Sequence, residues 1–590
     1  MPALSGRTVQ VVNDFSVEEQ LYLYERARRL KAVSVKQPAS TAPPLYEVQD
    51  GEASERIGQH DATVYLIFME SSTRTKESFR NAAAFQGVKV NEFQAETSSF
   101  QKNETICDTI KMLSVYSTQR TVFVIRSPLE GVCRWLETAL PRHAERYGVP
   151  RPSFLNAGDG KFTHPMAEFS DIFSILELSN WCRDSIHLAL VGDLSHGRTA
   201  HSKVDGLCIF KKVRVDLVAP DEFAYPVEYV NRMKDQGFEV RKFSSVEAYM
   251  DTASDSLAKL WYFCRPQMSK LGDLGEARID DLWGSVSFKQ QWQDKLPEGA
   301  KFLQTLPRDK DRPQVPLAFD TTSVNAWDSV ANNSYYLNIV ILGALHGAIG
   351  AGLPDRPDKV TPNDDEEEEL ENLFPLDPHC AHANLPAFLE NVSLVGRSTE
   401  RKPARANTGG STVPLRDGLV IDHVGLGDTP SDVWRRLRRV RSVIGWGRFL
   451  GSEGVYTSTG QKQGKKLKGI MHFPNMNFAE ISAMQLKIMA SIAPGCTVNA
   501  ISSSSVVKKL RLHMPEQIHG LPNTSCKNEL CVSHPNNKQR DVVTSFVRVK
   551  FYETSALPGA DASQEFLFVC KYCQWPHQYK DIWTYSATSS

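Results

Sequence analysis

Short apolar runs alternate with helical patterns through the first 350 residues of the chain. The runs at residues 62–68 (ATVYLIF), 121–127 (TVFVIRS) and 186–193 (IHLALVGD) have the length and composition of buried strands. Similar runs follow at KVRVDLVAP and AKLWYFCRPQ, and residues 130–148 (EGVCRWLETALPRHAERYG) show a helical pattern. Strands that alternate with helices at this spacing predict parallel α/β units, here arranged in two lobes.

Length and charge narrow the class of protein. A chain of 590 residues can bury several cores, and its formal net charge of −1 provides no bulk attraction to nucleic acid or to an anionic membrane. Residues 1–15 lack the apolar core of a secretory signal. The most apolar stretch, 335–353, carries Asn338 and His346, which favours a buried helix over a membrane span.

Because 11 cysteines are too few for a disulfide scaffold of this size, we expect free or metal-bound thiols and a cytoplasmic location.

The composition changes between Gly352 and Asp417, where prolines cluster and residues 363–371 (NDDEEEELE) form an acidic run. We predict a linker there, with a short ordered piece around LPAFLENV and the acidic run as a solvated spacer. The segment GLVIDHV then resumes as a strand. Residues 429–446 (TPSDVWRRLRRVRSVIGW) predict a capped helix whose arginines face solvent. Its apolar stripe consists of Val433, Leu437, Val440 and Ile444.

The stretch SSTRTKESF begins at Ser71, with two residues between it and the predicted strand at 62–68. Hydroxyl groups, unpaired N–H groups at a helix start and an arginine all donate hydrogen bonds to phosphate oxygens. Taken alone, this stretch is also compatible with an ordinary helix cap beside a surface arginine. Similar donor-rich loops follow the other predicted strands and point to a small polyanionic ligand. Their candidate residues are Ser98 and Lys102, Arg126, His164, Arg198, Arg265 and Gln267, and Leu306 and Pro307.

This ordered set resembles the transcarbamoylases, and specifically the aspartate carbamoyltransferase family, over about residues 60–350. The family's S-T-R-T phosphate signature is found at Ser72–Thr75. The elements at Arg265–Gln267 and Leu306–Arg308 look like the aspartate enzyme, and the Cys-Leu-Pro element expected of the ornithine enzyme is absent. The resemblance implies carbamoyl transfer from carbamoyl phosphate to L-aspartate, giving N-carbamoyl-L-aspartate and phosphate, in de novo pyrimidine biosynthesis.

The resemblance also implies a role for each candidate residue. Ser72, Thr73, Arg74 and Thr75 would hold the phosphate together with Arg126, while Thr75, Arg126 and His164 would polarise the carbonyl. Arg198, Arg265 and Gln267 would bind the aspartate carboxylates, and Leu306, next to Pro307, would offer its carbonyl oxygen to the reacting amine. Ser98 and Lys102 match a loop that enters the neighbouring subunit's site, so a homo-oligomer built from catalytic trimers is implied.

Three positions depart from the family pattern: Ala167 stands where a carbamoyl-contacting glutamine is expected, QTLP replaces His-Pro-Leu-Pro, and Asn338 replaces a bracing arginine. Losing one hydrogen-bond donor at the reacting group costs about two to three orders of magnitude in rate. Two alternatives therefore stay open. One is a catalytically impaired homologue that acts as a nucleotide-sensing or scaffold protein, and the other is a transcarbamoylase with a different amine acceptor.

Four cysteines near the C-terminus are spaced as metal ligands. Cys526 and Cys531 form C-x4-C, and Cys570 and Cys573 form C-x2-C. Two close thiolate pairs suit one tetrahedral, structural Zn²⁺ per chain. A zinc ribbon can also bind nucleic acid, but no basic or aromatic stripe surrounds these cysteines.

The block from residue 413 to about 580 resembles the regulatory chain of the same family. Asp422, His423 and Lys509 match its effector positions, Lys466 matches less closely, and Lys468 is the nearest candidate for a further lysine. The implied effectors are nucleotides of the ATP/CTP class.

We therefore predict an α/β two-lobed transcarbamoylase fold with two parallel-sheet domains, followed by an α+β nucleotide-binding regulatory domain and a small β-rich zinc-ribbon domain. The expected partners are carbamoyl phosphate, L-aspartate and nucleotides, without nucleic acid or membrane. The predicted divisions are 1–180 for carbamoyl phosphate, 181–350 for aspartate, 351–412 for the linker, 413–512 for nucleotide and 513–590 for zinc.

Overall fold

The structure is a computed structural model of the chain. It describes residues 4–36, 62–94, 104–116, 120–252, 256–272, 275–304, 306–350, 353, 385–394, 415–427, 429–445, 451–457, 467–521, 524–539, 542–550, 566–579 and 581–583.

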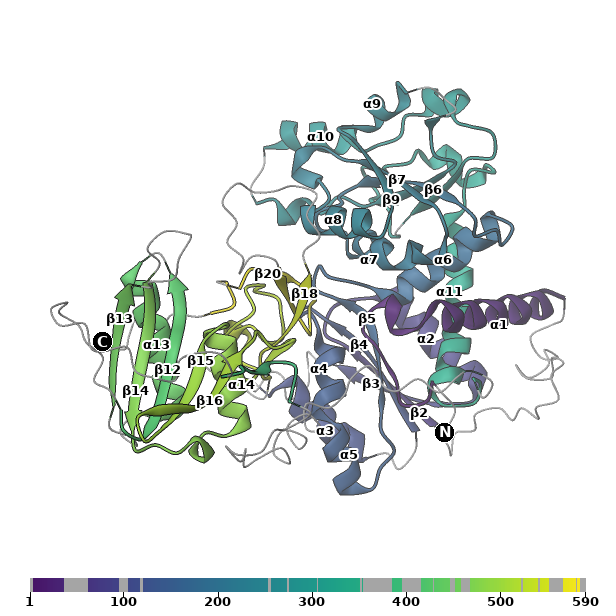
Figure 1. Ribbon diagram of the computed structural model, residues 1–590. Helices are drawn as coiled ribbons and strands as arrows, with labels where there is room; N and C mark the ends of the chain where they lie inside the picture. Colours follow the sequence, from purple (N-terminus) through teal and green to yellow (C-terminus); the bar gives the residue numbers. More distant parts are fainter. Residues whose placement is uncertain are drawn as a thin grey trace.

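The N-terminal lobe is built on a parallel sheet with the strand order β1-β5-β4-β2-β3 (Figure 1). Alternate residues of β2 enter two different cores, since Val64 and Leu66 pack on one face of the sheet and Tyr65 and Ile67 on the other. With both faces covered by other elements, β2 is apolar along its length, as is typical of buried parallel strands. The strands are β1 (Thr8–Val9), β2 (Ala62–Phe68), β3 (Lys89–Gln94), β4 (Arg120–Ser127) and β5 (Ser153–Asp159).

The helices of this lobe are α1 (Val17–Lys36), α2 (Thr73–Gln86), α3 (Ile106–Val115), α4 (Val132–Ala139), α5 (Pro141–Tyr147) and α6 (Pro165–Leu178). Residues 130–148, predicted as one helix, contain two, so that prediction was wrong in this detail. The break falls at Pro141, the first residue of α5. Proline has no N–H for the preceding turn and its ring clashes there, but it suits the first position of a new helix.

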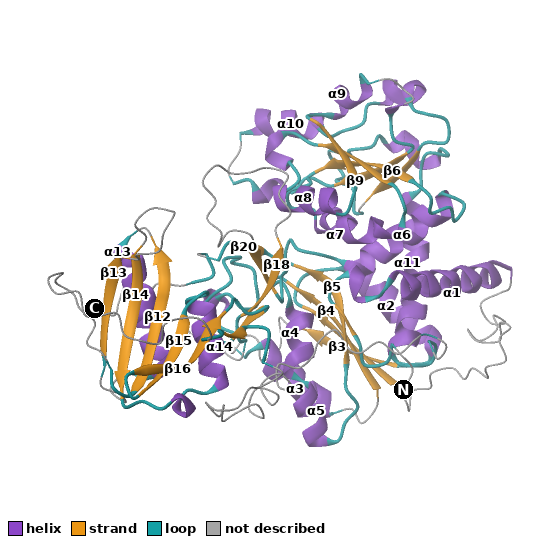
Figure 2. Ribbon diagram, in the orientation of Figure 1, coloured by secondary structure: helices purple, strands orange, loops and turns teal. Residues whose placement is uncertain are grey.

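The second lobe repeats the parallel architecture, with the strand order β10-β9-β6-β7-β8 (Figure 2). Its strands are β6 (Ile186–Gly192), β7 (Val213–Val218), β8 (Glu239–Phe243), β9 (Leu260–Cys264) and β10 (Lys301–Gln304). Its helices are α7 (Arg198–Gly206), α8 (Val227–Asp235), α9 (Val246–Met250), α10 (Glu276–Ser285) and α11 (Trp327–Leu345).

The helix α11 returns to the first lobe and packs against α1, α2 and α6. It contains most of the apolar stretch 335–353, and its residues from Tyr336 to Leu345 are buried, as expected for a core helix. In the described part of the chain, none of the helices has the length and hydropathy needed to cross a membrane.

The C-terminal half begins with a sheet of the order β11-β16-β15-β12-β14-β13, in which all pairs are antiparallel. The strands are β11 (Leu389–Asn391), β12 (Gly418–Gly427), β13 (Ser452–Thr457), β14 (Leu467–Pro474), β15 (Thr497–Ser502) and β16 (Ser505–Leu512). The predicted ordered piece within the linker range is β11, which pairs with β16 at the edge of this sheet. The acidic run lies outside the described residues.

Two helices, α13 (Pro430–Ile444) and α14 (Ala483–Ile492), cover one face of this sheet. The Thr429 hydroxyl caps α13 by accepting a hydrogen bond from the Asp432 N–H. The predicted apolar stripe of α13 is buried, with Val433, Leu437, Val440 and Ile444 all in the core. The opposite face of the sheet carries no helix in the described residues (Figure 2).

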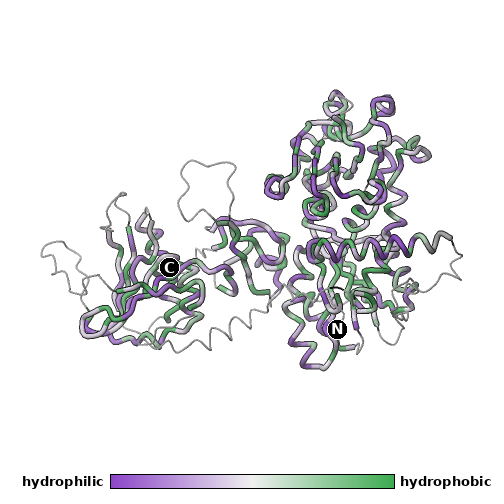
Figure 3. Tube along the Cα trace, turned by 45° about the vertical axis from the view of Figure 1, so that its right-hand side comes forward, coloured by the Kyte–Doolittle hydropathy of each residue, from purple (hydrophilic) through white to green (hydrophobic). Residues whose placement is uncertain are grey.

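A small antiparallel sheet, β17-β18-β19-β20, lies between the six-stranded sheet and the N-terminal lobe (Figure 1). Its strands are β17 (Gln517–His519), β18 (Ser545–Lys550), β19 (Phe566–Cys570) and β20 (Pro576–His577). The Tyr579 hydroxyl joins this part to α14 by donating to the carbonyl oxygens of Ser491 at 2.6 Å and Ile492 at 2.9 Å. In the turned view of Figure 3, a small middle part of the chain again lies between the two larger halves.

Candidate active site and associated sites

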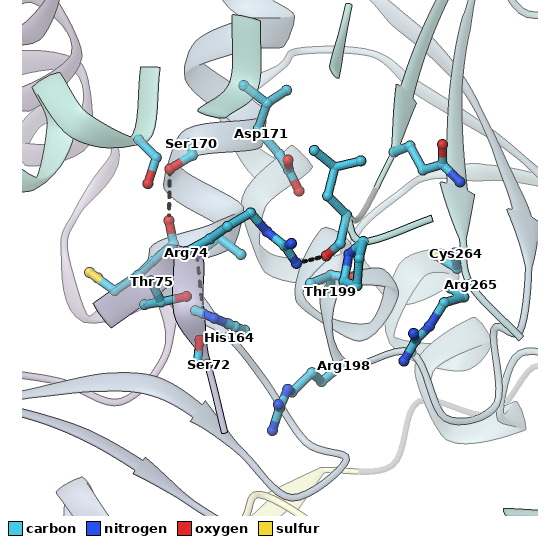
Figure 4. Close-up of a pocket in the computed structure, with 18 of the residues that line it drawn as sticks. Ser72, Arg74, Thr75, His164, Ser170, Asp171, Arg198, Thr199, Cys264 and Arg265 are labelled. Carbon is cyan, nitrogen blue, oxygen red and sulfur yellow. Dashed lines mark hydrogen bonds between the residues drawn. The ribbon is translucent and has the colours of Figure 1, made fainter. Parts of the chain in front are cut away.

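A cavity of about 830 Å³ lies between the two parallel lobes. Loops at the carboxyl ends of strands from both sheets line it, which is where open α/β sheets bind their ligands. Figure 4 shows Arg74, His164, Arg198 and Arg265 around one space although they come from four different elements. The cavity brings together Ser72, Thr73, Arg74, Thr75, Arg126, His164, Arg198, Arg265, Gln267, Leu306 and Pro307, and Ser98 and Lys102 lie outside the described residues.

The start of α2 forms one wall of the cavity. Ser72 is the residue before the helix, in an extended conformation with φ of −156°, and its hydroxyl makes no capping hydrogen bond within the described structure. The interpretation of this stretch as an ordinary cap is therefore wrong. Thr73, Arg74 and Thr75, in the first turn of α2, line the cavity together with Ser72. Such a helix start attracts anions through its N–H groups and its dipole.

Four arginines line the cavity and make it strongly cationic. The pKa of Arg126 is lowered to about 10, because burial and the nearby Arg198 and Arg74 lower it more than Glu70 raises it. Burial and Arg265 also lower the pKa of Arg74. Positive charges that weaken one another in this way are stabilised when an anion enters between them.

Glu70 is an acidic partner of two of these arginines, Arg126 and Arg198, and sequence reasoning missed it. Its Oε2 lies 3.1 Å from Arg198 Nη1 and 3.4 Å from Arg126 Nε. Arg198 also donates to the carbonyl oxygen of Gly160 at 3.1 Å, which orients its guanidinium. The position of Glu70 directly before the hydroxyl run was the available signal, because it places the carboxylate at the same strand end.

His164 is buried at the start of α6. Its Nδ1 accepts a hydrogen bond from the Ala167 N–H at 3.2 Å, so the proton of the neutral ring is on Nε2. Burial, followed by the charges of Arg126 and Arg198, holds the pKa of His164 well below its usual range. A neutral imidazole with its N–H directed away from the helix can donate a hydrogen bond to a carbonyl oxygen.

The second lobe contributes the remaining candidates. Gln267 is held by its backbone N–H, which donates to Asp193 Oδ2 at 3.0 Å, and by its side-chain amide, which donates to the carbonyl oxygen of His196 at 3.0 Å. Arg265 is exposed toward the cavity. The carbonyl oxygen of Leu306 accepts a hydrogen bond from Arg74, so this contact joins the two lobes across the cavity.

The departures from the family pattern also lie at this cavity. Ala167 and Gln304 line it, and Gln304 is the glutamine of QTLP. Asn338 on α11 donates from Nδ2 to the Ser78 hydroxyl at 2.7 Å, which ties α11 to α2. The Asn338 side-chain amide therefore connects α11 to α2 through an uncharged hydrogen bond.

The four cysteines meet in a second, buried cluster. Their sulfur atoms all lie within 4.8 Å of one another, with Cys526 Sγ 3.6 Å from Cys573 Sγ and Cys531 Sγ 3.7 Å from Cys570 Sγ. A tetrahedral metal with metal–sulfur bonds of about 2.3 Å requires sulfur–sulfur separations of about 3.8 Å. The donor set and its dimensions therefore fit a structural metal ion.

The cysteine cluster contacts the N-terminal lobe through Glu130. The Glu130 N–H donates to the carbonyl oxygen of Leu530 at 2.8 Å, and its own carbonyl accepts from the Val532 N–H at 2.9 Å. Its side chain accepts from the Lys161 N–H at 2.9 Å. Burial, followed by the charge of Asp159, raises the pKa of Glu130 to about 7.

The predicted effector residues lie on the helix-free face of the six-stranded sheet. Lys468 Nζ is 3.0 Å from Asp422 Oδ1, and His423 Nδ1 is 3.2 Å from Asp422 Oδ2. Burial opposes ionisation of Asp422, but His423 and Lys468 together hold its pKa at about 2. Lys509 on β16 pairs with Asn499 on β15, which in turn pairs with Val420 on β12. Lys509 therefore lies two strands away from Asp422, on the same face of the sheet. Lys466 is outside the described residues.

Residues 7–177 match the family model described as the aspartate/ornithine carbamoyltransferase carbamoyl-P binding domain. Residues 412–513 match the allosteric domain of the aspartate carbamoyltransferase regulatory chain.

Among curated proteins, the chain is 38% identical to Protein PyrBI of Thermotoga maritima, over 98% of this chain and 99% of that protein. It is 36% identical to Protein PyrBI of Treponema denticola, over 98% of both chains. It is 30% identical to the aspartate carbamoyltransferase catalytic subunit of Methanosarcina barkeri, over 52% of this chain and 87% of that protein. The chain therefore belongs to the aspartate carbamoyltransferase family, as a member with the catalytic and the regulatory part in one polypeptide.

Proposed function

We propose that the cavity between the parallel lobes transfers the carbamoyl group of carbamoyl phosphate to the amine of L-aspartate. The observation that carries this proposal is the convergence, in one cavity, of the uncapped start of α2 with Arg126, His164 and Arg198. The products are N-carbamoyl-L-aspartate and phosphate. Such a reaction requires positioning and charge stabilisation rather than a covalent intermediate.

The phosphate group is assigned to the start of α2. Its oxygens accept hydrogen bonds from Ser72, Thr73 and Thr75 and from the first N–H groups of the helix, while Arg74 and Arg126 supply charge. These donors remain in place as the carbon–oxygen bond to phosphate breaks, and they stabilise the departing dianion.

The carbonyl oxygen of carbamoyl phosphate is assigned to Thr75, Arg126 and the Nε2–H of His164. A neutral His164 polarises the carbonyl as a donor without taking up a proton at the pH of the reaction. When the amine attacks, negative charge develops on this oxygen and these donors compensate it. The proton lost from the amine leaves with the phosphate.

Aspartate is assigned to the second lobe, with its carboxylates on Arg198, Arg265 and Gln267. The carbonyl oxygen of Leu306 points toward Arg74 and so lies at the boundary between the two substrates, where it can accept a hydrogen bond from the amine. Pro307 follows it in the cavity wall.

The C-terminal half is assigned to regulation and assembly. Residues 413–512 bind a nucleotide of the ATP/CTP class at Asp422, His423, Lys509 and the nearby lysines, and the four cysteines hold one structural Zn²⁺. Six copies of the chain form two catalytic trimers that three pairs of C-terminal halves connect, and Ser98 and Lys102 complete the neighbouring subunit's site. Light scattering with and without a chelator tests this assembly, because a monomer under both conditions would contradict it.

The reaction is tested by a colorimetric assay of carbamoyl-aspartate with purified full-length protein. Arg126→Ala should lower the rate at least about tenfold with the fold unchanged, because it removes charge from both the phosphate and the carbonyl. Arg278→Ala is the matched control, since Arg278 is half exposed and pairs with Glu222 outside the cavity. No product from the parent protein at any substrate concentration would instead favour the impaired homologue that Ala167 suggests.

A further inference from the structure

A fully buried ion cluster lies directly behind the wall of the active-site cavity. The side chain of Lys203, on α7, is 0% exposed, and so is that of Glu168 on α6. The Lys203 ammonium donates to Glu168 Oε2 and, at 2.7 Å, to Asp171 Oδ2. None of the roles assigned above uses this lysine.

Lys203 contacts three residues that line the cavity. Besides Asp171, its Nζ lies 3.4 Å from the carbonyl oxygen of Thr199 and 4.1 Å from the centre of the Tyr262 ring. Asp171, Thr199 and Tyr262 all belong to the cavity wall, and Figure 4 shows the Asp171 carboxylate directed into the space between the lobes. The ammonium therefore lies immediately behind a carboxylate of the cavity wall, whose side chain is 5% exposed.

This carboxylate presents an electrostatic problem. Carbamoyl phosphate and aspartate both carry negative charge, so an unpaired Asp171 in the wall would repel both of them. Glu70, another acidic residue of the cavity wall, is already paired with Arg126 and Arg198. Lys203 is the cation that pairs with Asp171, and with a side-chain exposure of 0% its charge is not screened by solvent.

The rest of the cluster is arranged around this pair. The charged groups that face Glu168 are Lys203, Asp171 and Asp205, and its Oε1 has no hydrogen-bond partner among the described residues. Burial raises the pKa of Glu168 to about 7. Gly206 leaves the space for this side chain, because a methyl group there would overlap the Glu168 carboxylate.

We propose that Lys203 is a positioning residue of the transferase, whose buried ammonium offsets the charge of Asp171 and so reduces the negative charge that the cavity wall presents to the anionic substrates. It touches no substrate itself. This role rests on the proposed function of the cavity, but it concerns substrate affinity rather than the chemical step.

Lys203→Met tests the proposal by removing the charge while keeping the length of the side chain. The KM for both substrates should rise at least about tenfold, with a smaller change in kcat, because an uncompensated Asp171 repels the substrates. Adding Asp171→Asn should bring both KM values back to within about threefold of the parent, which a packing role of Lys203 would not do. Lys211→Met is the matched control, since Lys211 pairs with Asp184 on the surface.

Unchanged KM values in Lys203→Met, or a double variant as impaired as the single one, would overturn the proposal. If Lys203→Met does not fold, the KM values of Glu168→Gln test the proposal instead, because this variant leaves the pair of Lys203 and Asp171 in place. Its KM values should stay within about threefold of the parent, and a tenfold rise would show that the geometry of the whole cluster matters rather than the charge on Asp171. Failure of the proposed function would differ, because the parent protein would then form no product.

Discussion

The active-site cavity and the candidate effector surface both gather charged residues, but they leave those charges in different states. In the cavity, burial and the charges of Arg198 and Arg74 lower the pKa of Arg126, and Glu70 is shared as a counterion by Arg126 and Arg198. On the six-stranded sheet, Asp422 is already paired with Lys468 and His423. An anion entering the cavity relieves repulsion, whereas a nucleotide on the sheet must compete with an existing ion pair.

Sheet topology explains this difference. In a parallel sheet all strands end at the same edge, so loops far apart in sequence bring several cations to one place. In an antiparallel sheet the candidates lie across one face, and each charge has cross-strand neighbours that can neutralise it. The cavity is therefore the more sensitive region to loss of a single donor, and the regulatory half depends more on how its parts are held together.

The largest effect is expected at the cysteine cluster that holds the regulatory half together. Cys570→Ser/Cys573→Ser should abolish the binding of one Zn²⁺ per chain, because it removes half of the four thiolate ligands. Metal binding and folding are coupled at such sites, so the C-terminal half should unfold at a lower temperature than the catalytic lobes. Metal analysis and calorimetry check this, with Cys182→Ser, at an exposed cysteine, as the control. Equal zinc content in the variant and the parent would contradict the ligand assignment.

In the cavity, His164→Ala should lower kcat about 100-fold, because it removes one donor to the developing oxyanion. The readout is the rate of carbamoyl-aspartate formation at saturating substrate, with thermal unfolding to confirm that the variant is folded. His513→Ala serves as the control, since His513 pairs with Glu390 on the surface of the regulatory half. A His164→Ala variant with the parent's kcat would remove His164 from the reaction.

Ala167→Gln tests whether the cavity has room for the glutamine that the family resemblance led us to expect at this position. Ala167 lines the cavity on α6, with its N–H already bound to His164 Nδ1. A glutamine there should raise kcat several-fold by adding a hydrogen-bond donor to the reacting group. We expect a smaller gain in kcat than from a first oxyanion donor, because His164 and Arg126 already donate to the oxyanion. Steady-state kinetics of the two proteins check this, and a lower kcat would mean that the cavity has adapted to the alanine.

The smallest effect is expected for Asp422→Asn on the sheet. A carboxyl whose pKa is held at about 2 stabilises the fold above its unfolded pKa, and this contribution is lost as the pH falls toward 2. The parent should therefore be more stable than the variant at about pH 5, and the difference should shrink by about pH 3. Urea unfolding at both pH values measures it. A difference that does not depend on pH would mean that Asp422 stabilises the sheet by packing alone.

Much of the active site was predictable because its signals are local. The apolar run before Ser72 determines β2, and the hydroxyl run after it determines where α2 begins, so both follow from neighbouring residues. The cysteine spacing likewise predicted a metal site, because two close pairs of thiols satisfy one tetrahedral ion. Pro141 was a local signal for the break between α4 and α5, but the helical pattern of the surrounding residues concealed it.

The sequence by itself thus determined the strands, the donor-rich loops at their ends and the two thiol pairs, because each depends on residues adjacent along the chain. Only the tertiary structure decided which charges are paired. Glu70 meets Arg198, Lys203 meets Asp171 and Lys468 meets Asp422 only after helices and strands distant in sequence have packed together. Charge pairing depends on the distance between the groups and on their burial. These quantities decide whether a charged side chain binds a ligand, neutralises a neighbouring charge or stabilises the fold.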